Sequence, residues 1–122
     1  MFGLFQRPKL TVRFAASEAV SDEFARQVTL AGALTIANDG SEAVVGEIEM
    51  LIIAGFRRIP LTVPGDWQGF SLARGEAKTG QVEWSLTLDA PLRAQAGELY
   101  VSAKDQKRHK WEWRLPFTFA LR

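Results

Sequence analysis

Cysteine is missing from this chain of 122 residues. Its absence excludes disulfide bonds, thiol nucleophiles and thiolate ligands for a metal. It also fits a reducing compartment, so the sequence leads us to expect a cytoplasmic protein.

Histidine is nearly as scarce, because His109 is the only one. Zinc sites need three or four Cys, His or carboxylate ligands, and the acidic residues lack the Asp-x-Asp-x-Asp ladder of a calcium loop. No residue near His109 in sequence completes a nucleophilic triad, so His109 is expected to be an uninvolved surface side chain. No Gly-Lys-Ser/Thr phosphate loop is present either. We therefore expect no catalytic, metal or cofactor-binding residues and predict that the protein is not an enzyme.

Long apolar runs and an excess of one charge are also lacking. The longest apolar run, residues 48–54, contains Glu49 and falls far short of the roughly 20 residues that a membrane helix needs. The net charge is only +1, which does not favour a nucleic-acid binder. Apolar residues precede the cations at the N-terminus, which is the reverse of a signal peptide. We expect no membrane span and a cytoplasmic location.

Regular alternation of apolar and polar residues is what the sequence does contain. Residues 111–121 place Trp111 and Phe117 at positions of one parity, and Glu112 and Arg114 at positions of the other. A pleated strand sends these two sets to opposite faces, whereas a helix would bury the charges with the aromatic rings. The same alternation recurs in residues 10–14, 28–36, 48–53, 59–63, 70–72, 82–88 and 99–101.

About eight short strands separated by glycine, proline and asparagine turns favour a sandwich. We predict one all-β domain over residues 1–122, an antiparallel β-sandwich of immunoglobulin-like or arrestin-like type. Residues 15–26 alone have helical composition, and we expect there either a helical turn capped by Ser21 or Asp22, or a loop. Gly32 marks a bulge or a close approach of two backbones.

Two predicted strands each contain a proline. Residues 58–63 and 114–119 match in residue class, with Pro60 and Pro116 at equivalent positions. An internal repeat and chance similarity between short alternating segments are the two explanations of this match. Because proline has no N–H to donate, both strands are expected at a sheet edge or a bulge.

Three groups of residues are candidates for binding. Residues 104–110 form a basic stretch before two tryptophans, a mixture that can hold single-stranded nucleic acid, although the parity of Trp111 and Trp113 favours the core. Trp67, after Pro64-Gly65-Asp66, is the tryptophan expected in an exposed loop, where it could stack on a sugar. The apolar N-terminus is a candidate interaction anchor, although tucking against the domain is the alternative. The candidates are Phe2, Leu4, Phe5, Trp67, Lys104, Lys107, Arg108 and Lys110.

Four segments together resemble the arrestin-like fold, and the bacterial sporulation-control branch is the nearest match. They are residues 28–36, the strand Gly46-Glu47-Ile48-Glu49-Met50-Leu51, the step Phe70-x-Leu72-x-x-Gly75-Glu76, and the stretch from Val82 to Pro91. The resemblance implies a non-enzymatic scaffold or adaptor domain, and it implies no particular functional residue.

These observations predict a non-enzymatic protein-interaction or scaffold module whose partner and process the sequence does not identify. It would act through a sheet edge, the apolar N-terminus or the basic stretch, and a homodimer through edge strands is natural for such a fold. The alternative is a module that binds nucleic acid or carbohydrate through the basic stretch or Trp67. No cofactor is expected.

Overall fold

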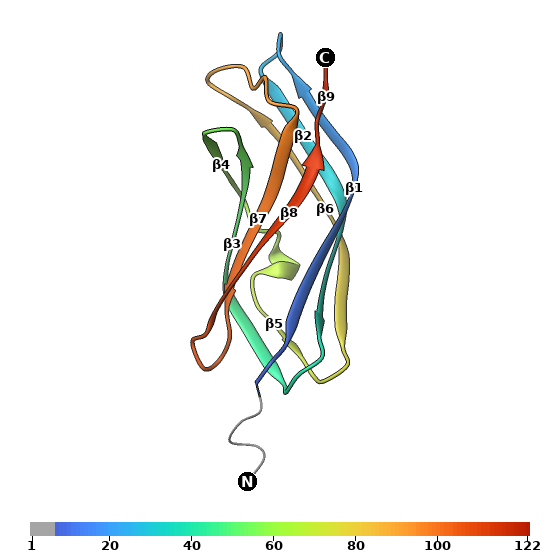
Figure 1. Cartoon of the computed structure of the whole chain (residues 1–122), viewed down its shortest axis with the longest axis vertical. Coiled ribbons are helices and arrows are strands. Elements are labelled where there is room, and N and C mark those ends of the chain that lie inside the picture. The colour runs from blue at the N-terminus through green and yellow to red at the C-terminus, as the bar shows by residue number, and fades with distance from the viewer. Residues whose placement is uncertain (1–6) are drawn as a thin grey trace.

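The computed structural model of this protein describes residues 7–122 and folds them into two β-sheets packed as layers (Figure 1). All neighbouring strands are antiparallel except the short parallel pair β1 and β9. The strands are β1 (Leu10–Asp22), β2 (Gln27–Asn38), β3 (Ala43–Ala54), β4 (Arg57–Leu61), β5 (Phe70–Leu72), β6 (Ala77–Thr87), β7 (Ala96–Lys104), β8 (Lys110–Thr118) and β9 (Ala120–Leu121), with a 3₁₀ turn at Gly65–Trp67. The predicted all-β sandwich is confirmed.

The strand order shows how the layers are joined. One sheet has the order β6-β2-β1-β9, and the other has the order β4-β3-β7-β8, with β5 also paired to β3. The chain leaves one sheet at the end of β8 and enters the other at β9, so it connects the layers along one side. No helix among residues 7–122 is long and apolar enough to cross a bilayer.

The core follows the alternation of the sequence. Leu30, Leu34 and Ile36 of β2 are fully buried and belong to one apolar cluster with Ile52 of β3 and Leu99 of β7. Burying such aliphatic side chains contributes roughly 1.5–3 kcal/mol each to folding. The β8 residues of apolar parity, Trp111, Trp113, Leu115 and Phe117, are partly buried against the same cluster.

Both strands that contain a proline lie at the ends of the second sheet. Pro60 is in β4 and Pro116 is in β8, and these are the first and last strands in the order β4-β3-β7-β8. The prediction of edge positions is confirmed. A missing N–H is tolerated there because the outer side of an edge strand has no partner strand.

The prediction for residues 15–26 is wrong. β1 continues through this segment to Asp22, pairs with β2 along its length, and is joined to it by a turn at residues 23–26. Pairing with β2 outweighs the helical composition of this segment, because it supplies a backbone hydrogen-bond partner at nearly every position of β1. Asp22 Oδ1 does accept a hydrogen bond from Ala25 N at 2.9 Å, but the bond closes a hairpin turn and begins no helix.

Gly32 lies where the two backbones come close. A Cβ atom there would be 2.4 Å from the carbonyl oxygen of Ala15, well inside any allowed contact. The register shifts between Ala16 and Glu18, so the bulge itself is on β1, across from this glycine. Of the two alternatives predicted for Gly32, the close approach is confirmed, and the bulge lies on the facing strand.

Candidate binding surface

The β7–β8 hairpin contains the four basic candidates, and its tip is closed by backbone hydrogen bonds. Lys104 pairs with Lys110, Asp105 N donates to the carbonyl oxygen of His109 at 3.1 Å, and Arg108 N donates to that of Asp105 at 2.9 Å. Arg108 adopts a φ of +65°, a left-handed conformation that is uncommon for residues with a side chain. We call residues 104–110 the basic hairpin.

The carboxylate of Asp105 is the centre of this hairpin. Its side chain is 0 % exposed, and Oδ1 accepts hydrogen bonds from Lys107 N at 2.8 Å and His109 N at 3.0 Å. Oδ2 accepts from His109 Nδ1 at 3.0 Å and Trp111 Nε1 at 3.2 Å. Burial alone would raise the pKa of Asp105, but these hydrogen bonds favour the carboxylate and together lower the pKa below its usual value.

His109 is at the surface, as predicted, with 43 % of its side chain exposed, and its ring is hydrogen-bonded to Asp105. An ionised carboxylate can only accept hydrogen bonds, so Nδ1 of His109 carries the proton in this contact. Histidine–carboxylate pairs occur in general-base sites. Here the same carboxylate also holds two backbone N–H groups and the Trp111 indole, so its contacts close the turn.

A second set of bonds fastens the hairpin to the rest of the domain. Gln106 Nε2 donates to the carbonyl oxygen of Glu42 at 2.8 Å, and Val44 N donates to Gln106 Oε1 at 2.9 Å. Glu42 immediately precedes β3 and Val44 lies at its start, so both partners are far from Gln106 in sequence. Asp105 thus holds the turn of the hairpin together from inside, and Gln106 ties the turn to the chain around the start of β3.

The cations of the hairpin differ in what surrounds them. Lys107, Arg108 and Lys110 are exposed, whereas Lys104 is half-buried. Glu47, in a bulge of β3 with φ +49°, lies 3.2 Å from Lys104 Nζ and 3.7 Å from Arg108 Nη1. The sequence analysis missed this counter-charge, because Glu47 is remote in sequence and only the sheet register brings it close.

A cavity of about 290 Å³ lies beside the hairpin and is lined by Arg7, His109, Lys110 and Trp111. Arg7 adds a cation that the sequence analysis did not group with the hairpin. The carbonyl oxygen of Arg7 accepts a hydrogen bond from Ser41 N at 2.9 Å, which ties this segment to the β2–β3 connection. Three of the four lining residues are basic side chains, so the cavity suits an anion.

The prediction of an exposed Trp67 is wrong. Trp67 is 2 % exposed in the 3₁₀ turn between β4 and β5, and it packs against Gly80 of β6. Its ring meets Phe70 edge-to-face at 5.8 Å, and Lys78 Nζ lies 5.0 Å from its centroid. The ring therefore lies inside the sandwich, between the 3₁₀ turn and β6.

The remaining candidates, Phe2, Leu4 and Phe5, lie outside the described residues. The structure instead exposes two phenylalanines that the sequence analysis passed over, Phe24 and Phe56. Each lies in a short turn beside charged residues. A large apolar residue inside a turn sequence is the feature that could have identified them.

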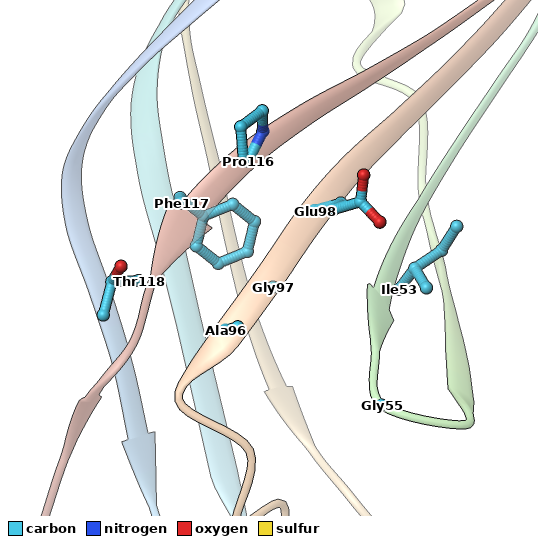
Figure 2. A pocket seen from close by; sticks show the side chains of 8 residues that line it. All are labelled: Ile53, Gly55, Ala96, Gly97, Glu98, Pro116, Phe117 and Thr118. Atoms are coloured by element: carbon cyan, nitrogen blue, oxygen red, sulfur yellow. The ribbon is translucent and has the colours of Figure 1, made fainter.

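The outer face of the second sheet has a hollow of about 510 Å³ over β3, β7 and β8 (Figure 2). Glu98 is the one ionisable residue that lines it, and its carboxylate lies 3.8 Å from Arg114 Nη1. Ile53 and Pro116 flank Glu98 in the figure. Further along the same face, the hydroxyl of Tyr100 donates to Glu112. This hydrogen bond, with burial and the charge of Glu112, raises the pKa of Tyr100.

No protein-family model matches this chain, and no curated protein is significantly similar to it. Solved structures do share its fold. An X-ray structure of a structural-genomics target is 16% identical over 93% of this chain and 86% of its own, with a TM-score of 0.56. β-Glucuronidase 2 of Bacteroides uniformis is 13% identical over 88% of this chain and 12% of its own, with a TM-score of 0.53. The alkylpurine DNA glycosylase AlkC of Pseudomonas fluorescens is 12% identical over 87% and 30%, with a TM-score of 0.50. At these identities the likeness shows the fold alone.

Proposed function

We propose that this protein is a non-catalytic interaction module that presents the basic hairpin to an acidic surface of a protein partner. The buried carboxylate of Asp105 is the observation that carries the proposal. It fixes the turn by four hydrogen bonds and leaves Lys107, Arg108 and Lys110 at the surface.

Rigidity supports a role in recognition. A loop that is ordered before binding loses less conformational entropy when it meets its partner. Asp105 and Gln106 order this hairpin with hydrogen bonds that do not use the side chains of Lys107, Arg108 or Lys110. Binding residues are also often placed on loops that a rigid scaffold positions, as here.

A homodimer through edge strands remains part of the proposal. β6 ends the first sheet and extends over residues 77–87, so it offers a long row of backbone groups for a second copy. β4 and β8 are less suited, because each contains a proline. The resemblance to the arrestin-like fold, and the scaffold or adaptor role that it implies, stay predictions from the sequence.

The second candidate function is binding of a polyanion such as single-stranded nucleic acid. The cavity lined by Arg7, His109, Lys110 and Trp111 favours it, because cations lie there beside an aromatic ring. Glu47 argues against it by pairing with Lys104 and Arg108, and the net charge of +1 is low for such a role. The carbohydrate alternative loses its support, because Trp67 is buried.

The test is a double charge reversal, Lys107→Glu with Arg108→Glu. Its control is Arg13→Glu with Arg74→Glu, which makes the same change of charge at exposed positions of β1 and of the turn between β5 and β6. Affinity capture from the native lysate with quantitative mass spectrometry should show partners that the hairpin variant loses and the control keeps. An unchanged set of partners would contradict the proposal.

The same variants separate the two candidate functions. Wild-type chain that is retained on immobilised single-stranded oligonucleotide, with a steep dependence on salt, would favour the polyanion. The hairpin variant should then lose retention and the control should keep it. If the wild-type chain flows through at low salt while the protein partners persist, the protein-interaction proposal stands.

A further inference from the structure

We infer that the end of the sandwich opposite the basic hairpin docks onto an anionic lipid surface by inserting Phe24 and Phe56. We call this the phenylalanine end. The β1–β2 and β3–β4 turns lie there, and the β7–β8 hairpin lies at the other end of the long axis (Figure 1). The inference goes beyond the proposed function, because it assigns a second surface to a different class of partner.

Both phenylalanine rings project from turns into solvent. Phe24 is 99 % exposed in the turn that joins β1 to β2. Phe56 is 108 % exposed in the two-residue turn between Ala54 and Arg57. In that turn Gly55 has a φ of +61°, as the first central residue of a type II′ hairpin requires. Phenylalanine is among the most often buried residues, so two bare rings at one end need an explanation.

One loop holds the two turns in place. Arg26 Nη1 donates to the carbonyl oxygen of Asp89 at 3.3 Å. Arg57 Nη1 donates to the carbonyl oxygens of Ala90 at 3.0 Å and Pro91 at 3.1 Å. Arg26 is two residues after Phe24, and Arg57 directly follows Phe56. The β6–β7 loop therefore fixes both turns on one platform, with a ring on each.

The charges around the rings favour an anionic surface. The turns, the β6–β7 loop and the adjoining strand ends contain more arginines than acidic residues. Two of the acids are matched: Asp89 Oδ1 lies 3.4 Å from Arg57 Nη2, and Glu23 Oε1 lies 2.8 Å from Arg93 Nε. The arginines are Arg26, Arg57, Arg58, Arg93 and Arg122, against Asp22, Glu23, Asp89 and Glu98. An arginine collar around apolar side chains is what an anionic bilayer interface binds.

The shape of this end favours lipid over protein. A stable protein interface buries roughly 800 Å² on each partner in a continuous, complementary patch. Here the apolar groups are two separate rings on protruding turns and the half-exposed Leu121 of β9, and the polar backbone of the β6–β7 loop lies between the two rings. A fluid bilayer can close around each ring separately, so it needs no matching surface.

Vesicle co-sedimentation with the full chain tests the inference. The wild-type chain should bind vesicles of phosphatidylcholine mixed with phosphatidylglycerol, bind less to phosphatidylcholine alone, and bind less at high salt. Phe24→Ser and Phe56→Ser should each lower the partition coefficient about tenfold, and the double variant should show no binding above background. Thermal unfolding should be unchanged, because the exposed rings make little contact with the domain.

Two controls make the result decisive. Val44→Ser removes a 46 % exposed apolar side chain from β3 and should leave binding intact, and so should the hairpin variant K107E/R108E. The inference is overturned if the wild-type chain binds neither kind of vesicle, or if the double phenylalanine variant binds as well as wild type. Concentration-dependent self-association that the double variant loses, without vesicle binding, would assign this end to a second copy of the chain instead. None of these results bears on the basic hairpin, so failure here leaves the proposed function untouched.

Discussion

Asp105 lies in a run of charged residues, yet its carboxylate is the buried acceptor around which the β7–β8 turn closes. Its four donors come from Lys107, His109 and Trp111. A sequence can indicate that an Asp suits a turn, but it does not show that the side chain will be buried. That depends on where the Trp111 indole and the β3 segment pack.

Asp105→Asn should destabilise the fold by about 1–3 kcal/mol at neutral pH, because an amide cannot accept from all four donors. The pKa of Asp105 is lowered in the folded state, so its carboxylate contributes stability above the unfolded pKa of about 3.9. That contribution is lost as the pH falls through the folded pKa. Urea unfolding from pH 7 to pH 3 should show the difference between variant and wild type shrinking below about pH 4. Exposed Asp39→Asn is the control, and an equal loss in both variants would contradict the assignment.

Tyr100 offers a direct check on the outer face of the second sheet. It is the only tyrosine in the chain, so absorbance at alkaline pH reports its ionisation alone. We expect its pKa above the ordinary value, because Glu112 accepts its hydrogen bond, the site is partly desolvated and the carboxylate is negative. Glu112→Gln should bring the pKa down towards the ordinary value. A titration that Glu112→Gln does not move would contradict the contact.

At the scale of elements, the β1–β2 pair shows how pairing overrides local composition. Residues 15–22 have helical composition, but they form the second half of β1 and pair with β2 up to Gln27. The proline strands were the opposite case. Pro60 and Pro116 have no backbone N–H, and no packing can change that, so their edge positions were predictable from sequence.

Gly32→Ala tests the close approach between these strands. The added Cβ would meet the Ala15 carbonyl oxygen at 2.4 Å, and backbone cannot move as a side-chain end can. We expect a loss of about 1–3 kcal/mol, from overpacking. Gly65→Ala is the matched control, because no atom lies within 4 Å of its added Cβ and it should change stability by less than about 0.5 kcal/mol. Equal denaturant midpoints for the two variants would show that the strands can separate at little cost.

At the scale of the whole molecule, the two sides of the sandwich are held together by different contacts. The passage from β8 to β9 connects the sheets on one side. On the other, Trp67 packs on Gly80 of β6, and Trp84 Nε1 donates to the carbonyl oxygen of Thr62 at 2.7 Å. The segment between β4 and β5 is therefore fastened to the opposite sheet.

Trp67→Ala should destabilise the whole fold by about 3–5 kcal/mol, because it removes the ring that fills this side. Phe56→Ala removes a ring of similar kind from solvent and should change stability by less than about 0.5 kcal/mol. Thermal and urea unfolding of both variants would measure the contrast. Similar losses in the two would contradict the burial that the structure assigns to Trp67.

The sequence by itself determined the fold class and much of the core. Alternation marks which side chains face inward in a pleated strand, and the positions of glycine and proline mark where strands end or lie at an edge. These are properties of the local chain. They sufficed to place Leu30, Phe117 and Pro116 correctly.

Only the tertiary structure decided which turn residues are buried and which charges meet. Trp67 and Phe24 both stand in polar turn sequences, yet one is buried and the other is bare, because only the first faces another sheet. Glu47 and Arg7 reach the basic hairpin through strand register and chain path. Burial and electrostatic pairing in turns depend on segments far away in sequence, and local patterns carry no information about them.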